Sequence, residues 1–108
     1  MAKVTTKAGV CGFEATIEAN VVAETDEGVT VGFSVKSSCP HVQKAAADIG
    51  EINAYQEIFK KPADTSIYKA LEGHLPHTAC PIYSAFFKAA EVAAGLALPA
   101  DVSMEIEK

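Results

Sequence analysis

Two of the three cysteines in this chain stand directly before a proline, and each of these pairs opens a stretch with helical spacing. The pairs are Cys39-Pro40 and Cys80-Pro81. Proline is favoured at the first position of a helix, because its missing N–H would have no partner there in any case. Each cysteine is therefore predicted at an N-cap, where free backbone N–H groups and the helix dipole favour thiolate over thiol. Thiolate is the form that binds a metal or attacks an electrophile.

The third cysteine, Cys11, stands at the predicted start of the first clear strand. Two histidines accompany the other cysteines: His41 is two residues after Cys39, and His77 is three residues before Cys80. Thiolates with imidazoles are the ligand set of zinc or of an iron–sulfur cluster. No CxxC spacing is present, so the fold would have to assemble such a site from three segments. His77 lies in a predicted loop and is the better candidate ligand. For His41, a solvated position in a first helical turn is as plausible as a role as a ligand.

Length and composition indicate one globular domain over residues 1–108, of which 49% are apolar. The net charge of −5 and the lack of a Lys/Arg cluster argue against a nucleic-acid partner. Residues 1–10 lack the apolar core of a signal peptide and no long apolar stretch follows, so we expect a cytoplasmic protein with no membrane partner. Thiols stay reduced in that compartment, and an odd cysteine count argues against a disulfide framework.

Alternation of apolar and polar residues predicts an antiparallel hairpin in the first third of the chain. Its strands cover 12–22 and 29–36, and Gly28 in the turn is free to adopt a positive φ. Residues 102–106 alternate again and are predicted to form a third strand, while residues 4–10 supply a fourth strand or extend the first. The side chains expected to face inward are Phe13, Ala15, Ile17, Ala19, Val21, Val29, Val31, Phe33, Val35 and Met104.

Helical spacing fills the middle of the chain. One apolar stripe follows Cys39 and stops at Gly50, and a longer one follows Cys80 and stops at Gly95. Shorter helices are predicted around 52–59 and 66–71. Strands, then helices, then a strand indicate an α+β fold, a small antiparallel sheet of three to four strands with helices packed on one face. The helix residues expected to face this sheet are Val42, Ile49, Phe86 and Ala89.

The sequence patterns of common enzyme classes are absent: there is no GxSxG, HExxH, P-loop or GxGxxG. The carboxylates of the first hairpin are predicted to be solvated charges and not an acid/base pair. Glu14 is kept as the exception, because it lies near Cys11 in sequence. We therefore expect a protein that is not an enzyme.

The layout of the cysteines resembles that of iron–sulfur scaffold proteins of the NifU/IscU type. That family has a Cys-Gly at its first strand, a hairpin, a cysteine at a helix start, and a last cysteine after a Leu-Pro loop and a histidine. The resemblance covers residues 11–93 and implies a SufE/NifU-like fold, a zinc ion or iron–sulfur cluster, and a sulfur donor or cluster-acceptor protein as partner. The features that carry it are Cys11-Gly12, Ser38-Cys39 and Leu75-Pro76-His77-Thr78-Ala79-Cys80.

Three positions depart from the pattern of that family. Phe13 stands where the family has an Asp that assists cluster release or metal binding. Ala79 stands beside the last cysteine where the family has its histidine, and Pro40-His41 replaces small residues after the second cysteine. The resemblance is thus to a divergent relative that keeps the three thiols and rebuilds their surroundings.

The leading hypothesis is a small scaffold-like protein that binds zinc or an iron–sulfur cluster through Cys11, Cys39 and Cys80, with His77 or His41 as the fourth ligand. A cation would offset the mutual repulsion of three thiolates. The second hypothesis is a metal-free thiol protein in sulfur relay or redox exchange, with Cys80 or Cys39 as nucleophile. The third is a structural or interaction domain whose cysteines are buried and inert.

Two expectations about the thiols follow from these hypotheses. The three sulfurs should converge although their segments are far apart in sequence. Cys80 should have a depressed pKa, because a helix N-terminus and His77 both lie beside it.

Overall fold

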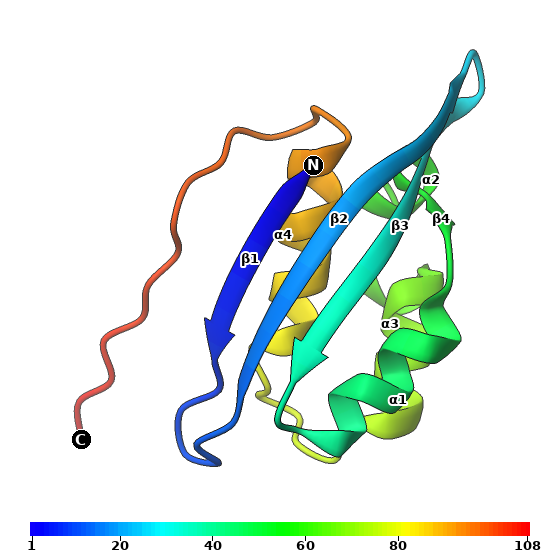
Figure 1. Ribbon diagram of the computed structural model, residues 1–108. Coiled ribbons are helices and arrows are strands. Elements are labelled where there is room, and N and C mark those ends of the chain that lie inside the picture. The colour runs from blue at the N-terminus through cyan, green and yellow to red at the C-terminus, as the bar shows by residue number, and fades with distance from the viewer.

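The structure is a computed structural model that describes residues 1–108, and it has the expected α+β fold. Four strands form one sheet in the order β1-β2-β3-β4, and each neighbouring pair is antiparallel (Figure 1). The strands are β1 (Ala2–Lys7), β2 (Glu14–Thr25), β3 (Gly28–Ser37) and β4 (Ile52–Asn53). The helices are α1 (Pro40–Ile49), α2 (Ala54–Ile58), the 3₁₀ turn η1 (Pro62–Asp64), α3 (Ser66–His74) and α4 (Ile82–Ala93).

The predicted hairpin is present as β2 and β3, with Gly28 at a φ of 147° in its turn. Of the inward set in β2, Ala15, Ile17 and Ala19 are buried, so the strand register was predicted correctly there. Val21 is 37% exposed, because the hairpin projects beyond the helices (Figure 1) and its register shifts at a bulge just after this residue. A bulge adds a residue to one strand and ends the simple alternation of faces.

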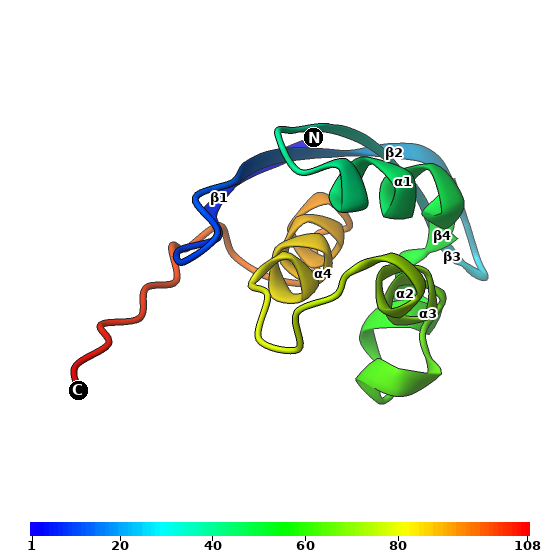
Figure 2. The same cartoon turned by 90° about the horizontal axis from the view of Figure 1, so that it is seen from below.

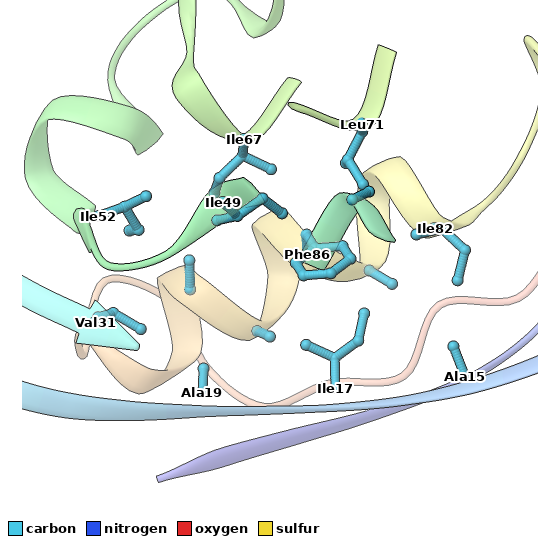
Figure 3. Close-up of a cluster of buried hydrophobic side chains, with 14 of the residues drawn as sticks. Ala15, Ile17, Ala19, Val31, Ile49, Ile52, Ile67, Leu71, Ile82 and Phe86 are labelled. Carbon is cyan, nitrogen blue, oxygen red and sulfur yellow. The ribbon is translucent and has the colours of Figure 1, made fainter. Parts of the chain in front are cut away.

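All helices lie on one face of the sheet, as Figure 2 shows from one end. α4 contacts β1 and β2, while α1 contacts β3 and α3. Phe86 of α4 is fully buried among the side chains of this layer (Figure 3). Its ring meets that of Phe33 edge-on, with centroids 5.4 Å apart. Val42, Ile49 and Ala89 are buried as predicted. One hydrophobic core therefore holds the helices against the hairpin.

The predicted C-terminal strand is wrong. Residues 102–106 have no regular structure, and Met104, expected in the core, is 74% exposed. Two other strands complete the sheet, one on each side of the hairpin: β1, which overlaps the strand predicted over residues 4–10, and the two-residue β4. An alternating pattern shows that a segment can pair as a strand, but pairing also needs a free edge within reach.

Two further boundaries differ from the prediction. β2 begins at Glu14, and Phe13 is 38% exposed in the connection before it. The segment around 52–59 divides into β4 and α2, because Asn53 caps the helix: its side-chain oxygen accepts hydrogen bonds from the N–H groups of Tyr55 and Gln56 at 3.1 and 3.4 Å. An Asx N-cap starts a helix at a defined residue.

A buried carboxylate joins α2 to α3. Glu57 is 4% exposed and accepts hydrogen bonds from the N–H and hydroxyl of Ser66 and from the N–H of Ile67. These N–H groups belong to the first turn of α3 and have no partner within the helix. Glu57 thereby satisfies the start of α3 and fixes its position against α2.

None of the helices combines the length and apolar character needed to cross a membrane; the longest, α4, has 12 residues.

We predict that Phe86→Ala lowers the free energy of unfolding by about 3–5 kcal/mol, because it empties a fully buried site. Phe59→Ala removes the same atoms from a side chain that is 74% exposed and should change stability by less than about 0.5 kcal/mol. Phe33→Ala, at a partly buried position, should fall between the two. Urea denaturation at unchanged m-value measures all three, and equal losses for Phe86→Ala and Phe59→Ala would contradict this core.

Candidate functional site

Three chain connections gather at one end of the sheet, the lower end in Figure 1. They are the β1–β2 connection, the junction of β3 with α1, and the α3–α4 connection. Each carries one cysteine, in the order Cys11, Cys39 and Cys80. The antiparallel hairpin brings the start of β2 and the end of β3 together, and α4 packs against β1 and β2.

Cys39 is the N-cap of α1, with Pro40 in the first turn, as predicted. Ser37 holds this junction: its hydroxyl donates to the carbonyl of Glu14 at 2.8 Å and accepts from the N–H of Cys39 at 3.0 Å. The Cys39 side chain makes no capping hydrogen bond to the helix. Its sulfur is therefore free to interact with groups outside α1.

Cys80 lies one residue further from its helix than predicted. The N-cap of α4 is Pro81, whose φ of −68° and ψ of −8° are already helical, and Cys80 precedes it in a turn. The N–H of Cys80 donates to the carbonyl of His77 at 3.3 Å. The sulfur accepts a hydrogen bond from the N–H of Ile82, so it still receives one donor from the helix start.

The expected depression of the Cys80 pKa is wrong in sign. Burial raises the pKa of the Cys80 thiol, because the low-dielectric surroundings disfavour the thiolate. The hydrogen bond from Ile82 lowers the pKa only in part, and negative charge on Cys11 and on Cys39 raises it further. Cys80 is therefore a protonated thiol at neutral pH when nothing is bound to it.

Cys11 is exposed in the β1–β2 connection and does not open β2 as expected. Gly9 and Gly12 flank it with positive φ angles of 85° and 73°, and no atom lies within 4 Å of where a Cβ would stand on either. The connection is closed by two backbone hydrogen bonds, Ala8 N–H to Phe13 carbonyl and Gly12 N–H to Gly9 carbonyl, both 2.9 Å. Little packing therefore restrains the position of Cys11.

The three cysteines line one pocket of about 180 Å³, and both candidate histidines line it as well. This confirms that the three segments converge. His74, the remaining histidine, points elsewhere and pairs with Asp48 of α1 at 2.5 Å. The pocket is lined by Ala8, Cys11, Phe13, Glu14, Ser37, Cys39, His41, Val42, Leu75, Pro76, His77, Cys80 and Ile82.

The side chains of the pocket are not arranged as a finished coordination sphere. No three Cys, His, Asp or Glu residues lie close enough together to hold a metal ion. The sulfurs are near enough for charge on Cys11 and Cys39 to act on Cys80, but ligands of one zinc would have to approach to bonds near ~2.3 Å. The donor types fit a soft metal, whereas their spacing in this structure does not yet fit one.

The burial of the thiols is lower than a structural domain with buried, inert cysteines would require. Cys11 is exposed, and Cys39 and Cys80 are half-buried at the rim of the core. None is enclosed as a small hydrophobe would be. All three remain open to reaction with a reagent or a ligand.

Two residues of the pocket were not recognised from the sequence. Ser37 organises the approach to Cys39, and the polar run Ser37-Ser38 at the end of an apolar strand was the available signal. Phe13 was expected in the core but lines the pocket. Where the resembling family has an acidic side chain, this pocket therefore has an aromatic wall, while Glu14 lies beside it.

We predict that alkylation of Cys80 by iodoacetamide, in metal-free protein, follows a pH profile whose midpoint lies above the usual ~8.5 of a free cysteine. The reason is the raised pKa of the half-buried Cys80 thiol, which keeps the reactive thiolate scarce at pH 7. Mass spectrometry of the separate cysteine peptides gives each midpoint. The midpoint is the readout because limited access scales the rate without moving it, and a value near 7 would contradict the site described here.

Comparison with known proteins adds membership of a family. Neither the curated proteins nor the solved structures contain a significant match to this chain. A family model, described as a family of unknown function (DUF6951), matches residues 2–106. With nearly all of its length covered, the chain belongs to the family of unknown function DUF6951.

Proposed function

We propose that this protein binds a soft metal centre, a zinc ion or an iron–sulfur cluster, through Cys11, Cys39 and Cys80, with His77 or His41 as the fourth ligand. It acts as a scaffold or carrier and not as an enzyme. The observation that carries the proposal is that three cysteines from three distant segments line one pocket together with two imidazoles. Thiolate and imidazole are the donors that zinc and iron–sulfur clusters take.

The electrostatics of Cys80 favour a metal over a free nucleophile. Its pKa is raised by burial and by the neighbouring thiols, so a metal-free protein would hold it mainly as the protonated thiol, the weaker nucleophile, at pH 7. A bound cation reverses that balance, because coordination deprotonates a thiol outright and offsets the charge of its neighbours. The metal-free sulfur-relay alternative lacks this support at Cys80.

The size of the pocket also agrees with a metal centre. Sites for drug-sized organic ligands usually enclose about 300–1,000 Å³. This pocket encloses about 180 Å³, which suits an ion or a small cluster better than an organic substrate.

Binding would require the ligands to approach one another, and Cys11 is the part of the site best able to move. It lies between two glycines on an exposed connection, while Cys39 and Cys80 are tied to α1 and to the start of α4. Metal binding would thus close the β1–β2 connection over the pocket. The thiols must be reduced for this, which fits a cytoplasmic protein, and a sulfur donor or cluster acceptor would be the corresponding partner.

The test is the metal content of protein purified without oxygen. We expect about one zinc ion or one iron–sulfur cluster per chain, measured by elemental analysis and by absorbance between about 300 and 500 nm. Cys39→Ser and Cys80→Ser should each weaken zinc affinity by at least about tenfold and lower the metal content of the purified protein, because outer-shell changes alone already cost about 10–100-fold in affinity. Unchanged metal content in both variants would overturn the proposal.

Two histidine variants form a matched pair for the fourth ligand. His77→Ala removes an imidazole that lines the pocket, whereas His74→Ala removes one engaged with Asp48 outside it. Of this pair, we expect only His77→Ala to weaken zinc binding if His77 is the fourth ligand. His41→Ala is measured in the same way, because His41 is the alternative fourth ligand. Equal affinity in all three variants would exclude both histidines as ligands.

The pH dependence of binding has a defined sign. Since the folded protein holds the Cys80 proton more tightly than a free cysteine would, zinc must displace that proton. We expect affinity to rise with pH between about 6 and 8, with proton release in calorimetry carried out in buffers of different ionisation enthalpy. An affinity independent of pH would mean that Cys80 is not a ligand.

A further inference from the structure

β1 is an edge strand with an unpaired side. It pairs with β2 alone, and nothing in the sheet order lies beyond it. Its six residues contain no proline, and the register with β2 is regular throughout. Edge strands of this kind present a row of free N–H and C=O groups to which another strand can add.

The last ten residues of the chain form an extended arm, residues 99–108, that leaves the body of the protein (Figures 1 and 2). Every residue of the arm is exposed. Its apolar side chains Val102, Met104 and Ile106 are 68%, 74% and 89% exposed and alternate with polar ones. The family model includes this segment as far as residue 106, so the arm is part of the domain that the family shares. Alternating apolar exposure of this kind indicates a strand without its partner.

The faces and charges of the arm and of β1 are complementary. In β1, Ala2, Val4 and Thr6 face the helix layer, while Lys3, Thr5 and Lys7 are exposed. An antiparallel alignment of the arm places its apolar residues on the helix side and its acidic residues on the lysine side. The opposed pairs would be Ile106 with Ala2, Met104 with Val4, Val102 with Thr6, Glu105 with Lys3, Ser103 with Thr5 and Asp101 with Lys7.

The direction of the arm indicates which β1 it pairs with. In Figure 1 the arm and β1 of the same chain run the same way, so pairing within one chain would be parallel. A two-fold axis perpendicular to the strands reverses β1 of the second chain, so that the arm and this β1 become antiparallel. Antiparallel pairing is the more stable ladder per residue, and the symmetric exchange pairs the free β1 edge of both chains at once. We propose that the arm of one chain adds as an antiparallel strand to β1 of a second chain, and that two chains exchange arms to form a symmetric dimer.

The first test is the state of association, measured by sedimentation velocity over a range of concentrations. The full chain should form dimers, and a chain ending at Leu98 should be monomeric at the same concentrations. A full chain that stays monomeric, or a dimer that survives removal of the arm, would overturn the proposal.

Charge variants test the alignment. Lys3→Glu with Lys7→Glu should weaken the dimer about tenfold or more, because two opposite-charge pairs in each ladder become like-charge pairs. Adding Asp101→Lys and Glu105→Lys to the same chain should restore it. Lys60→Glu with Lys61→Glu makes the same change of net charge at exposed positions outside β1 and serves as the control. If the variant with all four substitutions dimerises no more tightly than the variant with Lys3→Glu and Lys7→Glu alone, the alignment is wrong.

Cross-linking separates exchange between chains from pairing within one chain. A carbodiimide joins a lysine amine directly to a carboxylate, so Lys3–Glu105 and Lys7–Asp101 links are expected. In a mixture of normal and ¹⁵N-labelled protein that has been unfolded and refolded together, exchange of arms yields these links between a light and a heavy peptide. Links found only within light or within heavy chains would overturn the exchange.

Discussion

The packing of Phe86 between the hairpin and α3 is the contact on which the other features depend. Phe86 is fully enclosed and lies between Ile17 and Leu71 (Figure 3). Its ring also meets that of Phe33 of β3 edge-on. An aromatic side chain in such a position contributes both its buried area and a preferred ring geometry. Because α4 begins one turn before Phe86, this contact also sets where Cys80 stands. The core thus determines the pocket at the end of the sheet.

The pocket combines two opposing physical effects. Half-burial brings soft donors together, but it also disfavours their ionised form, as the raised pKa of Cys80 illustrates. Under the proposed function, a bound cation would displace the protons of these thiols and so offset the cost of ionising them. The same environment that weakens the case for a free nucleophile therefore supports the case for a metal centre.

The edge of the sheet and the pocket are linked through the chain. β1 leads directly into the connection that carries Cys11, and this connection has little packing of its own. A strand added to β1 would order the residues just before the site. The proposed association would therefore act on β1, and the proposed metal binding on the connection that directly follows it.

The sequence by itself determined the hairpin, the two longer helices and the core that joins them. Alternation in β2 and helical spacing around Val42 and Phe86 are local patterns that follow from which faces must be buried. It also indicated the convergence of Cys11, Cys39 and Cys80, through the repeated placement of cysteines at element boundaries. The hairpin and the helices depend on residues close together in the chain, which is why they could be predicted, whereas the convergence of the cysteines rested only on their shared placement near the ends of strands and helices.

Only the tertiary structure decided the sheet edges, the ionisation of Cys80 and the state of the C-terminal arm. A strand pattern such as that of 102–106 pairs only where an edge is free and within reach, and the sequence does not contain that information. The pKa of Cys80 depends on burial and on two sulfurs distant in sequence, which outweigh the local effect of the helix start. The pairing of a strand and the pKa of a thiol both depend on contacts between residues far apart in the chain, whereas a sequence pattern describes only neighbours along the chain.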